Sequence, residues 1–116
     1  MILGICGSRN FKDYKKFCDV MKDFKCVKIY SGACKGADQL AKRWAKENNI
    51  DFDEFPPDFI KYPTSKYGNK AYYERNVQIV DASDEILAFK AEDSRGTDLT
   101  IDIAKKKGKK YHIIDI

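Results

Sequence analysis

Residues 30–38 have the sequence Tyr30-Ser31-Gly32-Ala33-Cys34-Lys35-Gly36-Ala37-Asp38, and this stretch decides the fold class. The residues that lead into it, 26–30, are rich in β-branched and aromatic side chains, which is typical of a strand. Apolar side chains then recur at helical spacing, at Ala37, Leu40, Ala41, Trp44 and Ala45. Gly32 and Gly36 allow a tight turn between the two. The stretch therefore predicts a strand, a glycine-rich turn and a helix.

A turn of this kind suits an anion, most often a phosphate. It directs free backbone N–H groups and the positive end of a helix toward one point. The alternative is a tight connection in which the glycines serve only packing. A Walker loop is excluded, because Ala37 and Asp38 stand where that pattern, counted from Gly32, needs its second glycine and its lysine.

A dinucleotide-binding fingerprint is also absent from the sequence. The first predicted strand is followed by Gly7 alone, and the second ends at Tyr30-Ser31 without the expected acidic residue. These departures argue against NAD and against ATP hydrolysis of the Walker kind, so we predict no cofactor.

Composition indicates one soluble globular domain spanning residues 1–116. Apolar residues make up 43% of the chain and charged residues 34%, an ordinary balance for such a domain. No apolar run reaches membrane-spanning length and no signal-peptide pattern begins the sequence, so we expect a cytoplasmic protein without a membrane partner. The four cysteines form no Cys-x-x-Cys pair and His112 is the only histidine, which predicts reduced thiols and no metal site.

Net charge disfavours nucleic acid as a partner. The value is +4, from 22 basic and 18 acidic residues, and nucleic-acid binders usually concentrate more positive charge. The one dense basic run, Lys105 to Lys110, falls where a helix should end, and cations there complement the helix dipole. A nucleic-acid patch is the second interpretation of this run.

Strand and helix patterns alternate along the whole chain. The predicted strands are residues 1–6, 26–30, 51–55, 84–89 and 111–114, and the predicted helices are about 11–24, 36–48, 69–82 and 97–107. Thr97 is predicted to cap the last of these helices, and Leu99 to lie on its buried face. This alternation predicts an α/β fold: a single Rossmann-like domain whose mostly parallel five-stranded sheet carries helices on both faces. The segment 56–67, with three prolines and several aromatic residues, is predicted to be a lid.

Ligands of such sheets bind beyond the carboxyl ends of the strands. Four segments are predicted to meet there: residues 7–9, 32–36, 56–67 and 94–97. Because each follows a strand and opens a helix, we expect them to converge on one site.

Several motifs together resemble the SLOG superfamily, and most closely its small YspA-related proteins, which are often found in bacteria and phages. The resemblance covers nearly the whole chain. The motifs are Gly7-Ser8-Arg9, residues 31–38 with Leu40-Ala41 and Trp44-Ala45, Glu74-Arg75-Asn76, and Gly96-Thr97. The resemblance implies a Rossmann-like fold, a nucleotide or nucleotide-derived ligand, and a homodimer or higher homo-oligomer.

The resemblance also implies which residues bind the ligand. Gly32, Lys35 and Gly36, with Ala33 between them, would border a phosphate, as would Gly96 and Thr97, with Gly7, Ser8 and Arg9 beside it. Arg75 falls where the related phosphoribohydrolases keep an active-site arginine, and Asn76 follows it. Phe59 falls where this branch usually has tryptophan, a stacking surface for a base.

One departure concerns catalysis. The phosphoribohydrolases carry a glutamate two residues beyond the threonine of their glycine-threonine motif, and here that position is Leu99. Cleavage of a glycosidic bond needs a carboxylate to stabilise the transition state or activate water. Glu74 or Asp38 could substitute, so the sequence leaves open whether the protein is an enzyme.

Two site residues have alternative roles at this stage. Asp38 fits a ribose-binding carboxylate, and equally a cap for the first turn of its helix. Arg75 fits a planar clamp on a phosphate, or a surface salt bridge with Glu74 or Asp81.

Three classes of function follow. The favoured class is a module that binds or senses a nucleotide-like molecule. The alternatives are a phosphoribohydrolase-like enzyme, which Leu99 disfavours, and a single-stranded nucleic-acid binder resembling DNA-processing protein A, which the mild charge disfavours.

Overall fold

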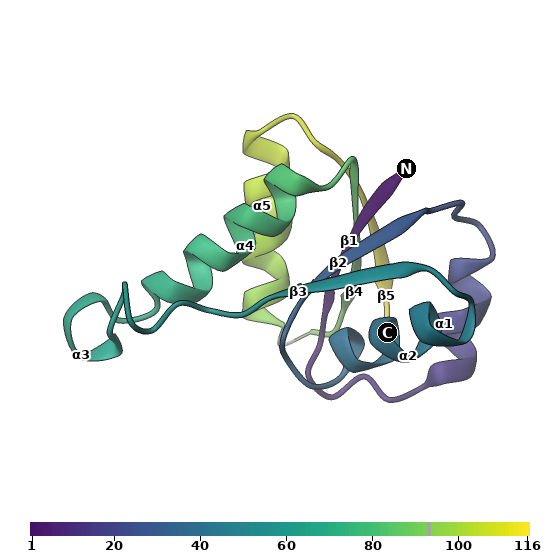
Figure 1. Cartoon of the computed structure of the whole chain (residues 1–116), viewed down its shortest axis with the longest axis horizontal. Helices are drawn as coiled ribbons and strands as arrows, with labels where there is room; N and C mark the ends of the chain where they lie inside the picture. Colours follow the sequence, from purple (N-terminus) through teal and green to yellow (C-terminus); the bar gives the residue numbers. More distant parts are fainter. Residues whose placement is uncertain (93) are drawn as a thin grey trace.

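A computed structural model describes residues 1–92 and 94–116, and Figure 1 shows its elements. In chain order they are β1 (Ile2–Gly7), α1 (Tyr14–Met21), β2 (Lys28–Gly32), α2 (Ala37–Glu47), β3 (Asp51–Phe55), α3 (Thr64–Tyr67), α4 (Lys70–Ala82), β4 (Glu85–Lys90), α5 (Arg95–Lys106) and β5 (Lys110–Asp115). Every helix in the described residues is too short or too polar to cross a membrane.

The strands form one sheet in the order β3-β2-β1-β4-β5. All four neighbouring pairs are parallel, which confirms the predicted α/β class and makes the sheet fully rather than mostly parallel. β1 lies at the centre, where Leu3 pairs with Ile29 on one side and with Glu85 on the other. A central strand is covered on both faces, which explains why β1 is almost entirely apolar.

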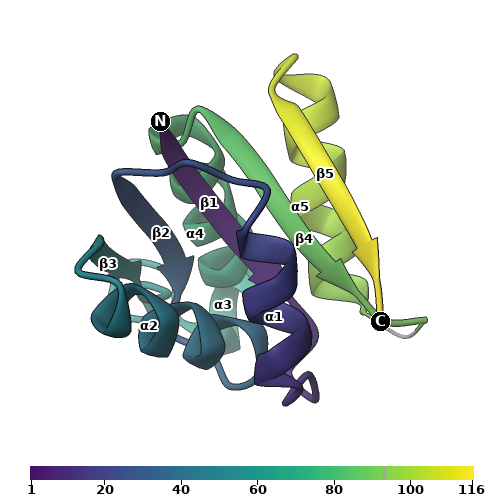
Figure 2. The same cartoon turned by 90° about the vertical axis from the view of Figure 1, so that its right-hand side faces the viewer.

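Helices cover both faces of the sheet, as Figure 2 shows: α1 and α2 lie on one face, and α4 and α5 on the other. Two buried clusters fill the spaces between the layers. Under α1 and α2, the rings of Phe11 and Phe17 both stack on Phe89, with centroids 5.0 Å apart in each pair. Under α4 and α5, the core consists of Ile79, Val80, Ile86, Ile103 and Ala104.

The start of α5 was predicted wrongly. Thr97 does not cap this helix, because the helix begins at Arg95 with Ser94 in the capping position. The Ser94 carbonyl already accepts a hydrogen bond from the Asp98 N–H, so the helical pattern starts before Thr97. Leu99, predicted to be buried, is only partly buried beside the α4–α5 cluster. The earlier start turns Thr97 into a residue of the first helical turn, facing inward.

The second strand was predicted two residues too early. β2 runs from Lys28 to Gly32. Val27 lies just before the strand, where its N–H donates to the Met1 carbonyl. Gly32 remains in the strand and pairs with Phe55 of β3. The glycine-rich turn therefore begins only after Gly32.

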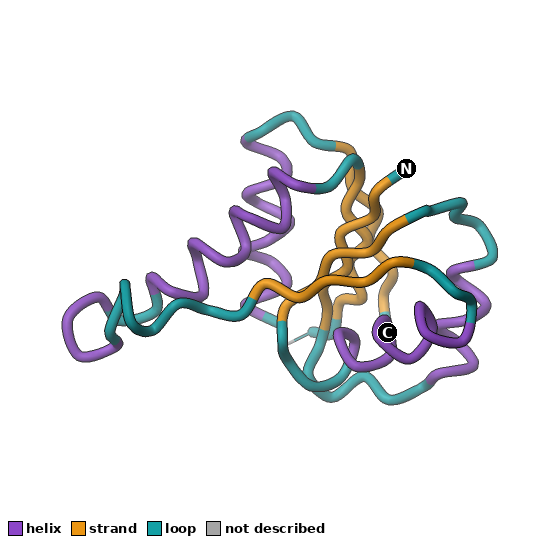
Figure 3. The backbone as a smooth tube through the Cα atoms, viewed as in Figure 1, coloured by secondary structure: helices purple, strands orange, loops and turns teal. Residues whose placement is uncertain are grey.

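Residues 56–70, which we call the arm, project from the body of the molecule between β3 and α4 (Figures 1 and 3). The projection makes the molecule elongated, with extents of 42 × 26 × 26 Å. Within the arm, α3 is a single helical turn with no buried residue. The arm is therefore a separate exposed feature beside the sheet.

Candidate functional site

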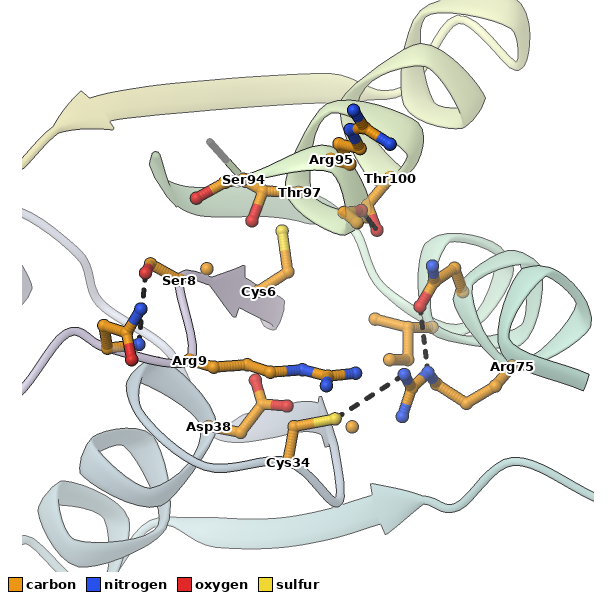
Figure 4. A pocket seen from close by; sticks show the side chains of 16 residues that line it. Cys6, Ser8, Arg9, Cys34, Asp38, Arg75, Ser94, Arg95, Thr97 and Thr100 are labelled. Carbon is orange, nitrogen blue, oxygen red and sulfur yellow. Dashed lines mark hydrogen bonds between the residues drawn. The ribbon is translucent and has the colours of Figure 1, made fainter. Parts of the chain in front are cut away.

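A cavity of about 320 Å³ lies at the carboxyl ends of β1 and β2, between the starts of α2 and α5 and the middle of α4. The crossover through α1 places β2 on one side of β1, and the later crossover through α4 places β4 on its other side. The cavity therefore lies at the topological switch point, where open parallel sheets bind ligands. Figure 4 shows side chains from these separate elements pointing into one space.

Most predicted site residues line this cavity: Gly7, Ser8, Arg9, Gly32, Asp38, Arg75, Asn76, Gly96 and Thr97. Four others do not line it, namely Ala33, Lys35, Gly36 and Phe59. The predicted convergence of residues 7–9, 32–36 and 94–97 on one edge is confirmed by the parallel sheet, whereas no residue of the fourth predicted segment, 56–67, lines the cavity.

Seven further lining residues were not predicted individually as site residues: Cys6, Asn10, Cys34, Ile79, Ser94, Arg95 and Thr100. Of these, Cys34, Ser94 and Arg95 lie in the segments 32–36 and 94–97, which were predicted to converge on the site. The inward direction of Thr100 follows from its position one helical turn after Thr97. Ile79 and Cys6 carried no such signal, since both resemble ordinary core residues.

Arg75 is the buried cation of the site, with 7% of its surface exposed. Its Nε donates to Asn76 Oδ1 at 2.9 Å, and its Nη1 to the Phe55 carbonyl at 3.5 Å. Its Nη2 lies 3.7 Å from the Cys34 sulfur. This arrangement excludes the surface salt bridge with Glu74 or Asp81 and fixes the guanidinium plane at the cavity wall.

Gly32 makes room for this guanidinium. A Cβ added to Gly32 would lie 2.4 Å from Arg75 Nη1 and 3.1 Å from Asp38 Oδ2. Real Cβ atoms essentially never come within 3.0 Å of such a neighbour. The glycine at the end of β2 therefore holds space for a side chain of α4.

Gly36 joins two loops. Its φ is +75°, and a Cβ there would lie 2.2 Å from the Ser8 carbonyl oxygen. The next residue, Ala37, donates its N–H to that same oxygen at 3.1 Å. The start of α2 is thus attached to the turn after β1, and part of its hydrogen-bonding capacity is used within the protein.

Asp38 contributes the carboxylate of the cavity. It lies in the first turn of α2 and is 9% exposed. Burial raises the pKa of Asp38 to about 7, although the Ser31 hydroxyl, the Arg75 charge and the Cys34 N–H favour its ionised form. Gly36 is the N-cap of α2, so Asp38 is not the capping residue and is free to serve the cavity.

The N-terminus of α5 is open toward the cavity. Ser94 makes no side-chain capping bond to this helix, because its Oγ accepts from the Ala91 N–H at 3.0 Å. Only 4% of the surface of Thr97 is exposed. Its hydroxyl forms no hydrogen bond with any residue that the structure describes. Figure 4 shows this hydroxyl pointing into the cavity. N–H groups and hydroxyls in this arrangement suit an anion.

Positive charge dominates the lining. The lining contains three arginines, Arg9, Arg75 and Arg95, against one acidic residue, Asp38. Cys6 adds no charge, because burial, with the nearby Asp38, raises the pKa of its thiol to about 12. The cavity is therefore suited to an anionic ligand that also offers hydroxyl groups.

An aromatic pair lies next to Arg75, outside the cavity lining. The Arg75 guanidinium carbon is 5.7 Å from the centre of the Tyr72 ring, and Tyr72 meets Phe59 edge to face at 5.4 Å. Phe59 is thus connected to the site through Tyr72.

Trp44 and His112 both lie away from the cavity. Trp44 packs against the core under α1 and α2, as its spacing predicts. His112 lies on β5, where its Nε2 is 2.6 Å from Glu85 Oε1. No group of three potential metal ligands occurs among residues 1–92 and 94–116.

Comparison with known proteins agrees with this fold. The chain is 32% identical over 111 residues to the Gene 61 protein of Mycobacterium phage D29, covering 90% of this chain and 88% of the phage protein.

Its fold also matches the X-ray structure of DNA processing protein A (DprA) from Streptococcus pneumoniae, with a TM-score of 0.77 and 17% identity. The match covers 97% of this chain but 49% of the DprA chain, so this chain spans about half of that protein. A family model described as the YspA, cpYpsA-related SLOG family matches residues 1–62. With the match to the phage protein, this shows that the chain belongs to the YspA, cpYpsA-related SLOG family.

Proposed function

We propose that the cavity binds a nucleotide or nucleotide-derived phosphorylated ligand and that the protein is a binding or sensing module. The observation that carries this proposal is the meeting of buried Arg75 with the open N-terminus of α5 in one cavity at the switch point of the sheet. Family membership and the DprA-like fold support a role connected with nucleotides or nucleic acids.

The phosphate would bind at the start of α5. Backbone N–H groups there, the Thr97 hydroxyl and Arg95 offer both hydrogen bonds and charge. The turn at 32–36 is the weaker candidate. Lys35 and Gly36 lie outside the lining, and the Ala37 N–H already donates to Ser8.

The sugar and base would extend from that phosphate toward α4. A buried carboxylate such as Asp38 accepts hydrogen bonds from ribose hydroxyls. The Tyr72–Phe59 pair beside Arg75 offers aromatic surface against which a base can pack. This division uses the cavity for the charged part of the ligand and the aromatic pair for its flat part.

Hydrolysis is the second candidate, because the cavity contains one carboxyl group with a pKa suited to proton transfer. Asp38, at about 7, could act as a general base or acid near neutral pH. The position assigned to the family's glutamate, Leu99, packs toward the core, and the neighbouring cavity-facing residue is Thr100, which is not acidic. A single carboxyl group favours binding without turnover.

Thermal-shift screening against nucleoside mono-, di- and triphosphates tests the proposal, followed by calorimetric titration of the best ligand. The wild type should bind, and Arg75→Ala should weaken binding. Lys106→Ala/Lys109→Ala, at the opposite end of the strands from the cavity, is the control variant and should bind normally. Native mass spectrometry of the same samples would also test the homodimer that the family resemblance implies. Failure of every nucleotide to bind would reject the proposal.

A further inference from the structure

The arm, residues 56–70, combines exposed aromatic rings with lysines. A Lys-Tyr pair occurs twice, as Lys61-Tyr62 and Lys66-Tyr67, and a third lysine, Lys70, follows. Each of the first two ammonium groups lies 5.4 Å from the ring centre of the tyrosine beside it. The arm thus repeats one arrangement of a cation and a ring.

Lys70 connects the two pairs. Its ammonium nitrogen is 5.2 Å from the Tyr62 ring centre and 5.4 Å from that of Tyr67. The two rings meet edge to face, with centroids 5.7 Å apart. Three lysines and two rings therefore form one continuous patch, which we call the arm patch: Lys61, Tyr62, Lys66, Tyr67 and Lys70.

The arm patch has no partner within the described part of the molecule. None of its lysines forms an ion pair there, and α3 buries no residue. The same segment exposes Ile60 by 95%, Phe59 by 44% and Tyr67 by 39%. Asp58 is the one acidic residue of residues 56–70, so the segment is net positive.

We propose that the arm patch binds single-stranded nucleic acid. Unpaired bases stack on aromatic side chains, while neighbouring cations bind the phosphates between them, which is the usual composition of non-specific single-strand sites. The exposed lysine–tyrosine contacts are weak enough to exchange, so the rings can accept bases while the ammonium groups move to phosphates. Paired bases of a duplex present no face for such stacking.

This proposal extends beyond the cavity and concerns a different surface. It also accounts for the mild overall charge: the net charge of the whole chain is +4, but residues 56–70 alone contain three lysines and one acidic residue. A partner that carries negative charge and flat rings can bind both the lysines and the tyrosines of the arm patch. An acidic protein surface would satisfy the lysines alone.

Fluorescence anisotropy with labelled oligothymidylate of about 20 nucleotides tests the proposal on the full chain. Wild type should bind the single strand more tightly than a duplex of equal length. Lys61→Ala/Lys66→Ala/Lys70→Ala should weaken binding by tenfold or more. Removal of three phosphate contacts should also flatten the dependence of log K on log salt by about 2. The matched control, Lys105→Ala/Lys106→Ala/Lys109→Ala, removes as many charges elsewhere and should bind normally.

A second pair of variants separates stacking from charge. Tyr67→Phe keeps the ring and should retain affinity, whereas Tyr67→Leu should lose roughly tenfold. Because the arm buries no core residue, both variants should melt like the wild type. Equal loss in the control triple variant, or equal affinity for duplex, would overturn the proposal.

Other partners would give different results. If the arm variants changed the oligomeric state by light scattering without any binding of oligothymidylate, the patch would be a contact between copies. Binding to phosphatidylserine vesicles in place of the oligonucleotide would make it a membrane contact. Titration of a mononucleotide into the same arm variants should match wild type, which keeps this test separate from that of the cavity.

Discussion

The guanidinium of Arg75 fills the space that a side chain at position 32 would need, since a Cβ on Gly32 would lie 2.4 Å from Arg75 Nη1. A glycine expected to admit a phosphate to the backbone instead admits an arginine from α4. The two residues are 43 positions apart in the sequence, and only the parallel arrangement of the sheet brings them together.

The first prediction follows from this contact. Gly32→Ala should displace the guanidinium and weaken nucleotide binding nearly as much as Arg75→Ala does. The double variant should bind no more weakly than Arg75→Ala alone, because both changes remove one interaction. Calorimetric titration of the three variants measures this coupling. Additive losses would show that Gly32 acts on the ligand independently of Arg75.

The second prediction concerns Arg75 itself. Arg75→Ala should weaken a phosphorylated ligand by roughly ten- to a hundredfold, since a charge-assisted hydrogen bond contributes about 1.5–3 kcal/mol. Arg75→Lys should recover only part of the affinity, because lysine lacks the planar fork that Asn76 and Phe55 position. Calorimetry gives the affinities, and melting temperatures check that the variants remain folded. Full recovery by lysine would reduce the role of Arg75 to charge alone.

The third prediction concerns pH. Burial raises the pKa of Asp38 from its ordinary value of 3.8 to about 7, so between these values the folded chain holds a proton that the unfolded chain has released. Stability should therefore fall as pH rises from about 4 to about 7, by at most about 1.4 kcal/mol per pH unit from this group.

Asp38→Asn is the matched variant for the pH effect. Its free energy of unfolding should lack this downward contribution, so it should gain on the wild type as pH rises toward 7. Urea unfolding of both proteins at several pH values measures the difference. Parallel stability curves would mean that Asp38 titrates normally in the folded protein.

The fourth prediction concerns turnover. Purified protein should release no appreciable base from nucleoside monophosphates, because Asp38 is the single carboxyl group among the described lining residues. Chromatographic detection of free base after long incubation is the measurement. Robust release of base that disappears in Asp38→Asn would instead establish hydrolase activity and identify Asp38 as the catalytic residue.

The fold could be predicted well from the sequence because its signals are local. The apolar run of β1 follows from burial on both faces, and the spacing of Ala37, Ala41 and Ala45 follows from the buried face of α2. The errors occurred at boundaries. Thr97 was mistaken for a cap, because Ser94 and Thr97 are both acceptable capping residues and only the hydrogen bond from Asp98 to Ser94 distinguishes them.

The site could be predicted less completely because it depends on contacts between distant residues. That the turns containing Gly7, Gly32 and Thr97 would meet followed from the alternation of strands and helices, whereas Arg75 was placed there by the family resemblance. What each glycine does could not follow, since Gly32 faces Arg75 and Gly36 faces the Ser8 carbonyl through side chains and loops remote in sequence. The projection of the arm was likewise invisible, because its aromatic residues suggested a lid packed over the cavity.

An amide NMR titration tests the central claim most directly, with the nucleotide that gives the largest thermal shift as the ligand. The account predicts that the largest shifts occur at the backbone N–H groups of Gly96 and Thr97 and at Nε of Arg75, with little change from Lys105 to Lys110. Shifts confined to Lys105 to Lys110, with none at the start of α5, would contradict a nucleotide site in the cavity.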